Sequence, residues 1–274
     1  QWVSFYSGKE FKDHKVFYLN EYKKEEWNFF KVLEKKFKKK LALFFPMNLK
    51  NDFSRDTFFL PDPWTETDIN ADYILKKIFS IFKRIILENS SNKISVFDYF
   101  ILTLFTLFKT SFKFKIFILK NVFKIKKFKF FKALIFDRLC WEIFKENKSR
   151  KNSDISSLFL NGCAHIQHHY LLNSKVVESE TKNPEWYLSN IDPVLECLTA
   201  YDNILGEIKN FKNTDILILT GLSQTVIDKP IFYYNLTQPE NFFKNIDINY
   251  QKIIKRMSRD YTLSFNSKID FENA

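Results

Sequence analysis

Three of the four histidines in this chain lie within five residues of one another, in the stretch Leu158–Tyr170. If that stretch is helical, His165 and His169 share a face, because side chains four residues apart lie one above the other. His168 then points away from this pair. Two imidazoles on one helix face suit metal binding or proton transfer to a phosphate. The alternative is a polar turn whose imidazoles are only solvated or hydrogen-bonded.

The residues around the histidines predict the elements that position them. The apolar run from Ser157 to Leu160 is typical of the end of a buried strand, and Asn161 with Gly162 favours a turn. A helix is expected from Ala164 onward. In a parallel α/β sheet this arrangement places the histidines beyond the carboxyl end of a strand, which is where such sheets bind ligands.

A second segment is expected to reach the same place. Thr214–Thr220 is β-branched and largely apolar, which predicts a strand in the middle of a parallel sheet. The loop that follows, Gly221–Gln224, should then line the cavity that holds the histidines. We therefore expect Ser223 and Gln224 to contact a substrate there, beside Gln167 and His168.

Arg259 and Asp260 precede a final predicted strand, Tyr261–Phe265. A guanidinium group can form two parallel hydrogen bonds to an anionic oxygen pair, and Asp260 can orient it. The alternative for these two residues is an ordinary surface ion pair that leads into the strand.

The rest of the chain alternates helical patterns with short apolar strands. Leu41–Phe45 is a continuous apolar run ended by Pro46, a pattern typical of a strand buried on both faces. Asp192 followed by Pro193 predicts a capped helix that runs to Leu205. Together these patterns predict an α/β fold, a mostly parallel sheet flanked by helices.

Residues 68–150 differ in composition from the rest. They contain no glycine or proline and carry Phe, Ile, Leu and Lys at helical spacing. We expect a helical insertion, or cap, within an α/β core made of residues 1–67 and 151–274. The apolar run Tyr99–Phe108 is only about half of the roughly 20 residues needed to span a bilayer. A basic, aromatic surface that sits on anionic lipid is an alternative to a merely solvated lysine face.

The composition of the chain limits which partners and which compartment can be expected. The 274 residues carry a formal net charge of +11, but Phe, Lys and Asn are used so heavily that compositional bias alone can account for many lysines. The three cysteines form no CxxC pair and fit a reducing compartment, so we expect a cytoplasmic protein, with peripheral contact to a membrane as the alternative. No stretch resembles an RNP motif or a zinc knuckle, and we expect no nucleic-acid partner.

The order of these pieces resembles the alkaline-phosphatase-like superfamily, in particular its type I phosphodiesterase and nucleotide-pyrophosphatase branch. There a strand leads into an Asp-x-x-Gly-His turn, then a helix, then a strand that ends in Ser-Asp-His-Gly. The histidine stretch, the helix from Asp192 and the strand Thr214–Thr220 follow this order. The fragment LPDPW at residues 60–64 is similar to a segment that precedes the helical cap in that branch. The resemblance covers about residues 25–66 and 155–265.

The resemblance implies a hydrolase of phosphate or sulfate esters that uses a divalent metal, zinc or manganese. His165 falls where the superfamily has a metal-binding Asp, and His169 where it has a metal-binding His. Gly221 and Leu222 replace an Asp-His pair that supplies further ligands. The nucleophilic Thr or Ser is expected in a segment before Gln1, so the chain is expected to be a fragment.

Three functions therefore remain open from the sequence. The first is a metal-assisted esterase acting on a small phosphate or sulfate ester or on a glycan or lipid headgroup. The second is a catalytically inactive relative that only binds an anionic ligand. The third is a protein that associates with membrane surfaces through its basic aromatic helices.

Overall fold

The computed structural model describes residues 2–17, 28–87, 95–148, 152–178, 182, 186–220, 223–226, 234, 236–255 and 261–273. The chain divides into two compact units, residues 1–228 and 229–274, and each is described here by itself. The sequence prediction had placed residues 229–274 with the α/β core. The apolar and aromatic run Ile231–Leu236, whose composition also favours a strand, lies largely outside the described residues.

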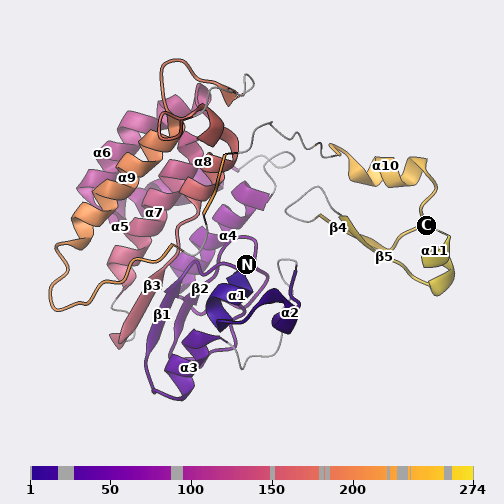
Figure 1. Cartoon of the computed structure of the whole chain (residues 1–274), viewed down its shortest axis with the longest axis horizontal. Coiled ribbons are helices and arrows are strands. Elements are labelled where there is room, and N and C mark those ends of the chain that lie inside the picture. Colours follow the sequence, from indigo (N-terminus) through magenta and orange to yellow (C-terminus); the bar gives the residue numbers. More distant parts are fainter. Residues whose placement is uncertain are drawn as a thin grey trace. The chain divides into compact units, whose positions relative to one another are not determined.

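A three-stranded parallel sheet forms the centre of the first unit (Figure 1). Strand β1 (Leu41–Phe44) lies between β2 (Phe58–Leu60) and β3 (Ile155–Leu158), and both pairings are parallel. The expected α/β class with a parallel sheet flanked by helices is therefore confirmed. All four residues of β1 are fully buried, as its uninterrupted apolar sequence predicted.

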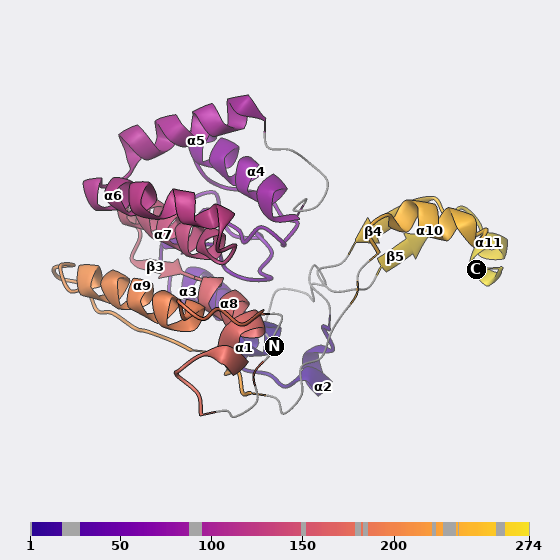
Figure 2. The ribbon, with the colours of Figure 1, turned by 90° about the horizontal axis from the view of Figure 1, so that it is seen from above.

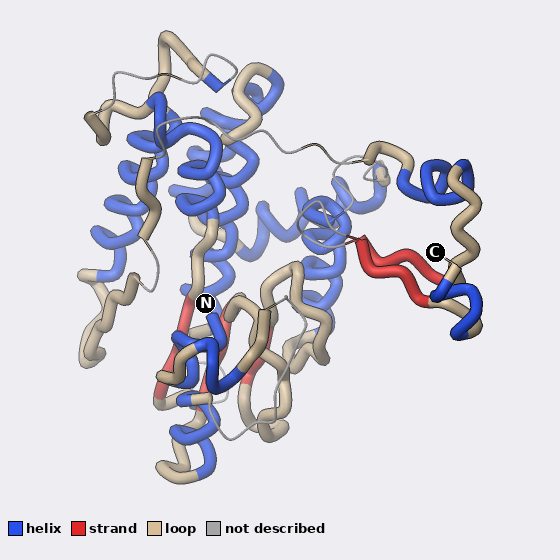
Figure 3. The backbone as a smooth tube through the Cα atoms, turned by 45° about the vertical axis from the view of Figure 1, so that its right-hand side comes forward, coloured by secondary structure: helices blue, strands red, loops and turns tan. Residues whose placement is uncertain are grey.

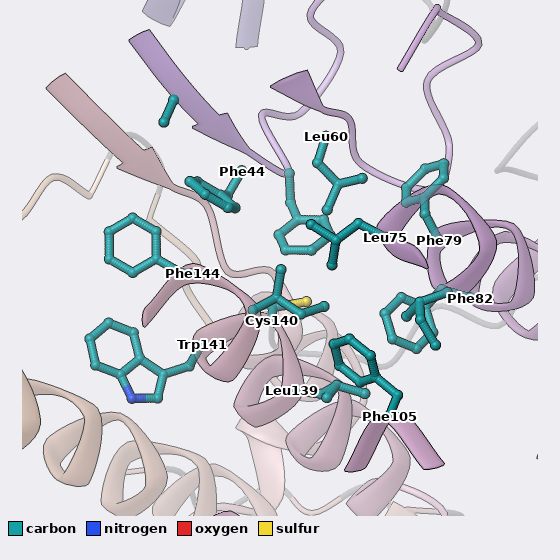
Figure 4. Packing of buried hydrophobic residues seen from close by; sticks show 14 of the residues in the cluster. Phe44, Leu60, Leu75, Phe79, Phe82, Phe105, Leu139, Cys140, Trp141 and Phe144 are labelled. Atoms are coloured by element: carbon teal, nitrogen blue, oxygen red, sulfur yellow. The ribbon is translucent and has the colours of Figure 1, made fainter. Parts of the chain in front are cut away.

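Alternate residues of the sheet serve two different hydrophobic clusters, because successive side chains of a strand point to opposite faces. On one face, Phe44 and Leu60 pack with helices α4 (Tyr73–Leu87) and α7 (Phe131–Asn147) in the largest cluster (Figure 4). On the other face, Leu43 and Phe59 pack with Tyr6 and Phe30. The sheet is thus covered on both sides, as parallel sheets require.

The helices of the first unit are mostly those that the sequence predicted. They are α1 (Trp2–Ser7), α2 (Phe11–His14), α3 (Phe29–Lys35), α4 (Tyr73–Leu87), α5 (Val96–Lys109), α6 (Phe112–Asn121), α7 (Phe131–Asn147), α8 (Gly162–Tyr170) and α9 (Pro193–Ile208), with short 3-10 turns at Val122–Lys126 and Leu171–Asn173.

Two of these helices begin with side-chain caps, and the cap at Asp192 is the one that the sequence predicted. The hydroxyl of Ser95 accepts the backbone N–H of Asp98 at the start of α5, at 3.0 Å. The carboxylate of Asp192 accepts the N–H groups of Val194 and Leu195 at the start of α9.

The expected helical insertion corresponds to α4–α7, which provide all the regular structure described in residues 73–148. Helices α4 and α7 belong to the same hydrophobic cluster as the sheet, with Trp141 and Cys140 of α7 fully buried in it (Figure 4). That these helices are an insertion into a smaller domain stays a prediction. No helix within the described ranges is long and apolar enough to cross a membrane.

The prediction of a strand at Thr214–Thr220 is wrong. After α9 the chain runs on without regular structure, and this segment is exposed, with Leu217 79% accessible. A β-branched apolar sequence favours extended backbone, but a strand also needs a neighbouring strand to satisfy its amides and carbonyls. The three strands of the sheet lie elsewhere in the sequence, and none pairs with this segment.

The second unit contains an antiparallel hairpin and two short helices (Figure 3). Its elements are α10 (Pro239–Asn245), β4 (Lys252–Lys255), β5 (Tyr261–Ser264) and α11 (Lys268–Glu272). The strand predicted at Tyr261–Phe265 is confirmed by β5.

Glu207 of α9 forms the hydrogen bonds that hold this helix against α7. Its carboxylate accepts hydrogen bonds from Arg138 at 2.9 Å, from the indole N–H of Trp141 at 2.7 Å and from Lys145 at 2.8 Å. Partial burial raises the pKa of Glu207, but these three donors outweigh it and bring the pKa down to about 2. The charged carboxylate therefore stabilises the contact between the two helices.

Replacing Glu207 by Gln should lower the free energy of unfolding at pH 7 by about 2 kcal/mol, because Arg138 and Lys145 lose a charged acceptor. A depressed carboxyl pKa stabilises the fold above the unfolded-state value near 4.5, and that contribution is lost as the pH falls toward about 2. Urea titrations from pH 7 to pH 2 should show a smaller acid-induced loss in Glu207→Gln than in the wild type.

Glu146→Gln is the matched control, since this exposed residue of α7 loses the same charge. Equal destabilisation by the two substitutions would contradict a specific role for Glu207.

Candidate functional site

The histidine stretch forms helix α8, which follows the carboxyl end of β3 after a turn of three residues. The helix begins at Gly162, two residues before the predicted start. Its Ile166 and Tyr170 pack in a hydrophobic cluster with α7 and α9. The predicted placement of this helix beyond a parallel strand is confirmed.

Asp137 of α7 holds the first turn of α8. Its carboxylate oxygen Oδ2 accepts the backbone N–H of Gly162 at 2.8 Å and the hydroxyl of Tyr201 at 2.6 Å. The Tyr201 oxygen in turn accepts the N–H of Cys163 at 3.2 Å. Side chains from α7 and α9 thus satisfy amides that a helix start leaves without intrahelical partners.

Burial raises the pKa of Asp137 to about 6, although hydrogen bonds from Tyr201 and from the backbone of Gly162 and Asn161 act in the opposite direction. The sequence reasoning missed this residue. A signal for it existed, because Asp137 occupies the same helical face as the apolar Leu134, Trp141 and Phe144. An acid in a buried stripe needs hydrogen-bond donors, and the helix start supplies them.

Gly162 is required where α8 meets α7. A Cβ atom at this position would lie 2.5 Å from Oδ2 of Asp137, far inside van der Waals contact. The absence of a side chain lets the carboxylate approach the first amide of the helix directly.

The thiols of Cys163 and Cys197 form a second contact between α8 and α9. Cys163 is half-buried, Cys197 is fully buried, and both are free. The hydrogen bond between the two thiols and burial together raise the pKa of Cys197, so its thiol remains protonated.

His165 and His169 lie one turn apart with ring centroids 5.3 Å from each other and planes at 81°. The shared face predicted for them is confirmed. The indole of Trp186 lies 4.5 Å from the His169 ring and covers it on another side. Surrounding protein disfavours the charged form and lowers the pKa of both imidazoles, and repulsion from His168 adds to the effect. Both are therefore neutral near pH 7, with nitrogen lone pairs that a metal can bind.

The pair satisfies one geometric condition for a common metal ligand set. A tetrahedral ion about 2.1 Å from a nitrogen of each ring would hold the two ring centres about 5 Å apart. In the parts of the chain that the structure describes, no group of three or more His, Cys, Asp or Glu side chains could hold a metal ion. The two imidazoles are thus a partial ligand set.

The other predicted site residues divide into two groups. Gln224 donates from Nε2 to the carbonyl oxygen of Ala164 at 3.1 Å, so the segment Ser223–Val226 reaches α8 even though the strand before it is absent. Gln167 is half-buried on α8, while His168 and Ser223 are exposed. The remaining predicted residues, Gly221, Leu222, Arg259 and Asp260, lie outside the described residues.

No protein-family model matches the chain, and neither does any curated protein or any solved structure.

Gly162→Ala should destabilise the first unit, because Asp137 or the start of α8 must move to admit the new methyl group. We expect a lower melting temperature, with a loss of about 1–3 kcal/mol typical of forced repacking in a filled interior. Gly206→Ala is the control, since a Cβ there meets nothing within 4 Å. This glycine lies inside α9, so alanine should raise the melting temperature slightly. Equal shifts of the same sign would contradict the close approach of Asp137.

Proposed function

We propose that this protein is a metal-assisted hydrolase of phosphate or sulfate esters, of the alkaline-phosphatase-like and type I phosphodiesterase kind. The observation that supports this most is the pair of neutral imidazoles, His165 and His169, on one face of a helix that follows a parallel strand. The substrate class in this proposal is a small phosphate or sulfate ester, or a glycan or lipid headgroup that carries one.

In the proposed site, His165 and His169 hold a zinc or manganese ion. Such an ion, when bound, supplies Lewis-acid stabilisation of negative charge on the transferred group. Trp186 keeps the His169 ring in place and shields it from water on one side. The proposal assigns the nucleophile to none of the residues 1–274.

The polar groups beside the imidazoles are assigned to substrate binding. Gln167 and His168 lie on the same helix, and Gln224 is held against it through Ala164. Ser223 adds a hydroxyl to that loop. Arg259 and Asp260, which lie outside the described residues, stay a proposed anion-binding pair on the sequence alone, with Arg259 forming two hydrogen bonds to an anionic oxygen and Asp260 orienting its guanidinium group.

An inactive protein that only binds an anionic ligand is the second candidate. It is favoured by the partial ligand set, because two imidazoles alone make a weak metal site. Metal analysis separates the candidates: a hydrolase of this kind should hold stoichiometric zinc or manganese at His165 and His169, whereas the inactive relative should not.

His165→Gln and His169→Gln should each abolish metal-dependent stabilisation and hydrolysis while leaving the metal-free melting temperature close to that of the wild type. Stabilisation by a ligand requires binding to the folded state and reaches about 2.7 kcal/mol at a hundredfold excess over Kd. Thermal melts with and without zinc or manganese measure this effect. His168→Gln is the matched control, because this exposed imidazole on the same helix should keep the metal-induced shift.

Equal metal-induced shifts in all four proteins would reject the metal site. A large drop in melting temperature without metal, in either variant, would show instead that the imidazole is needed for folding.

Metal-induced stabilisation should persist at pH 6.5 and disappear only at lower pH. An imidazole whose pKa is lowered takes up its proton, and so releases a metal, below the ordinary value of 6.5. The measurement is the zinc-induced shift of the melting temperature between pH 5 and pH 8. A midpoint above pH 6.5 would contradict the lowered pKa of both rings.

A further inference from the structure

Helices α5 and α6 leave an unusual number of large apolar side chains in solvent. Phe108, Phe112 and Phe123 are 77%, 75% and 78% exposed. We call the whole exposed set the α5–α6 face. Its members are Val96, Phe97, Tyr99, Phe100, Leu104, Leu107, Phe108, Phe112, Ile116, Leu119, Val122 and Phe123.

These side chains are arranged by helical periodicity. In α6 and the turn after it, Phe112, Ile116, Leu119 and Phe123 follow one another at spacings of four, three and four residues, which places them along one side. Val96, Phe100, Leu104 and Leu107 repeat the pattern along α5. The inward side of each helix is occupied by other residues, Phe105 in α5 and Phe114 in α6, which belong to the main core.

The two helices lie on the outer side of the helical layer. Figure 2 shows α5 at its edge, with α4 and α7 between α5–α6 and the rest of the first unit. Only two residues, Thr110 and Ser111, separate the helices, so the exposed rings of Phe108 and Phe112 flank the corner between them.

The charge of this region is as distinctive as its apolar surface. Residues 99–132 contain nine lysines and no aspartate or glutamate. Outside this segment, 34 lysines and arginines stand against 32 acidic residues, so most of the net charge of +11 is concentrated here. Lys109, Lys113 and Lys120 are exposed beside the aromatic side chains.

We propose that the α5–α6 face docks on the surface of an anionic lipid bilayer. Aromatic and leucine side chains enter the boundary between headgroups and acyl chains, while surrounding lysines attract anionic headgroups. A second copy of the chain does not fit this face, because two such surfaces would bring Lys109, Lys113 and Lys120 of both copies together without an acidic partner on either face. The docking is superficial, since no described helix is long and apolar enough to cross the bilayer.

The test is cosedimentation of the full chain with vesicles of phosphatidylcholine alone or with 30% phosphatidylserine. We expect binding to the anionic vesicles at low salt and substantial release in 0.5 M NaCl, because salt screens the attraction of lysines to the surface. Each lysine near an anionic surface contributes about fivefold to the partition coefficient. Lys109→Glu with Lys113→Glu should therefore reduce it at least 25-fold.

Two matched controls separate this face from general basicity. Lys35→Glu with Lys39→Glu changes the net charge equally at exposed positions outside the face, and should retain most of the binding. Phe108→Ser with Phe112→Ser should weaken binding at least tenfold at unchanged charge, whereas Phe37→Ser, at another exposed ring, should not. Far-UV circular dichroism and melting temperature verify that each variant is folded.

Several results would overturn the proposal. One is the absence of binding to anionic vesicles at low salt. The others are an equal loss of binding in the two double lysine variants, and full binding by the Phe108→Ser, Phe112→Ser variant. Concentration-dependent dimerisation that the phenylalanine variant abolishes would assign the face to a second copy instead. Hydrolysis of a soluble ester should be unchanged in all these variants, so this proposal and the proposed function can fail independently.

Discussion

The complete burial of β1 is the constraint on which the rest of the first unit depends. A strand with no solvent contact must be covered on both faces and paired on both edges, because no water is available to its amides and carbonyls. β2 and β3 pair with the two edges of β1. Ala42 and Phe44 pack in one hydrophobic cluster, and Leu41 and Leu43 pack in another on the opposite face. Helices α4 and α7 are needed on one side to cover Phe44 and Phe58. They therefore belong to the same hydrophobic core as the sheet.

Helix α7 connects the buried sheet to the helix that carries the histidines. One side of it packs on the sheet through Cys140 and Phe144. From the same helix, Asp137 binds the start of α8, and Arg138, Trp141 and Lys145 bind Glu207 of α9. The position of the imidazole pair is therefore set by a carboxylate from a helix that precedes it by some 25 residues. Buried polar contacts of this kind fix orientation, because a displaced partner leaves an unsatisfied group in the interior.

Sequence patterns were sufficient wherever a local rule decided the structure. The apolar run of β1, the Asp192 cap and the four-residue spacing of His165 and His169 all depend on neighbours in the chain. Prediction failed where the deciding partner was distant. Thr214–Thr220 has the composition of a central strand, but composition does not supply a pairing strand. Asp137 likewise could not be matched with Gly162 without knowing that α7 crosses the start of α8. The sequence shows an acid, Asp137, within a buried stripe, but it does not show which groups donate hydrogen bonds to that acid.

The two faces of α8 make a structural role for the imidazole pair unnecessary. Ile166 and Tyr170, four residues apart, carry the packing of this helix against α7 and α9 and are nearly inaccessible to solvent. His165 and His169 lie one position earlier on the adjoining face, where His165 is exposed and His169 contacts Trp186. Surrounding protein disfavours charge on both rings and lowers both pKa values, and repulsion from His168 adds to that cost. A surface that needed only solubility would be served by lysine or glutamate without that cost. In the proposed metal site, this arrangement would keep two neutral imidazole nitrogens close together, in the form that binding an ion requires.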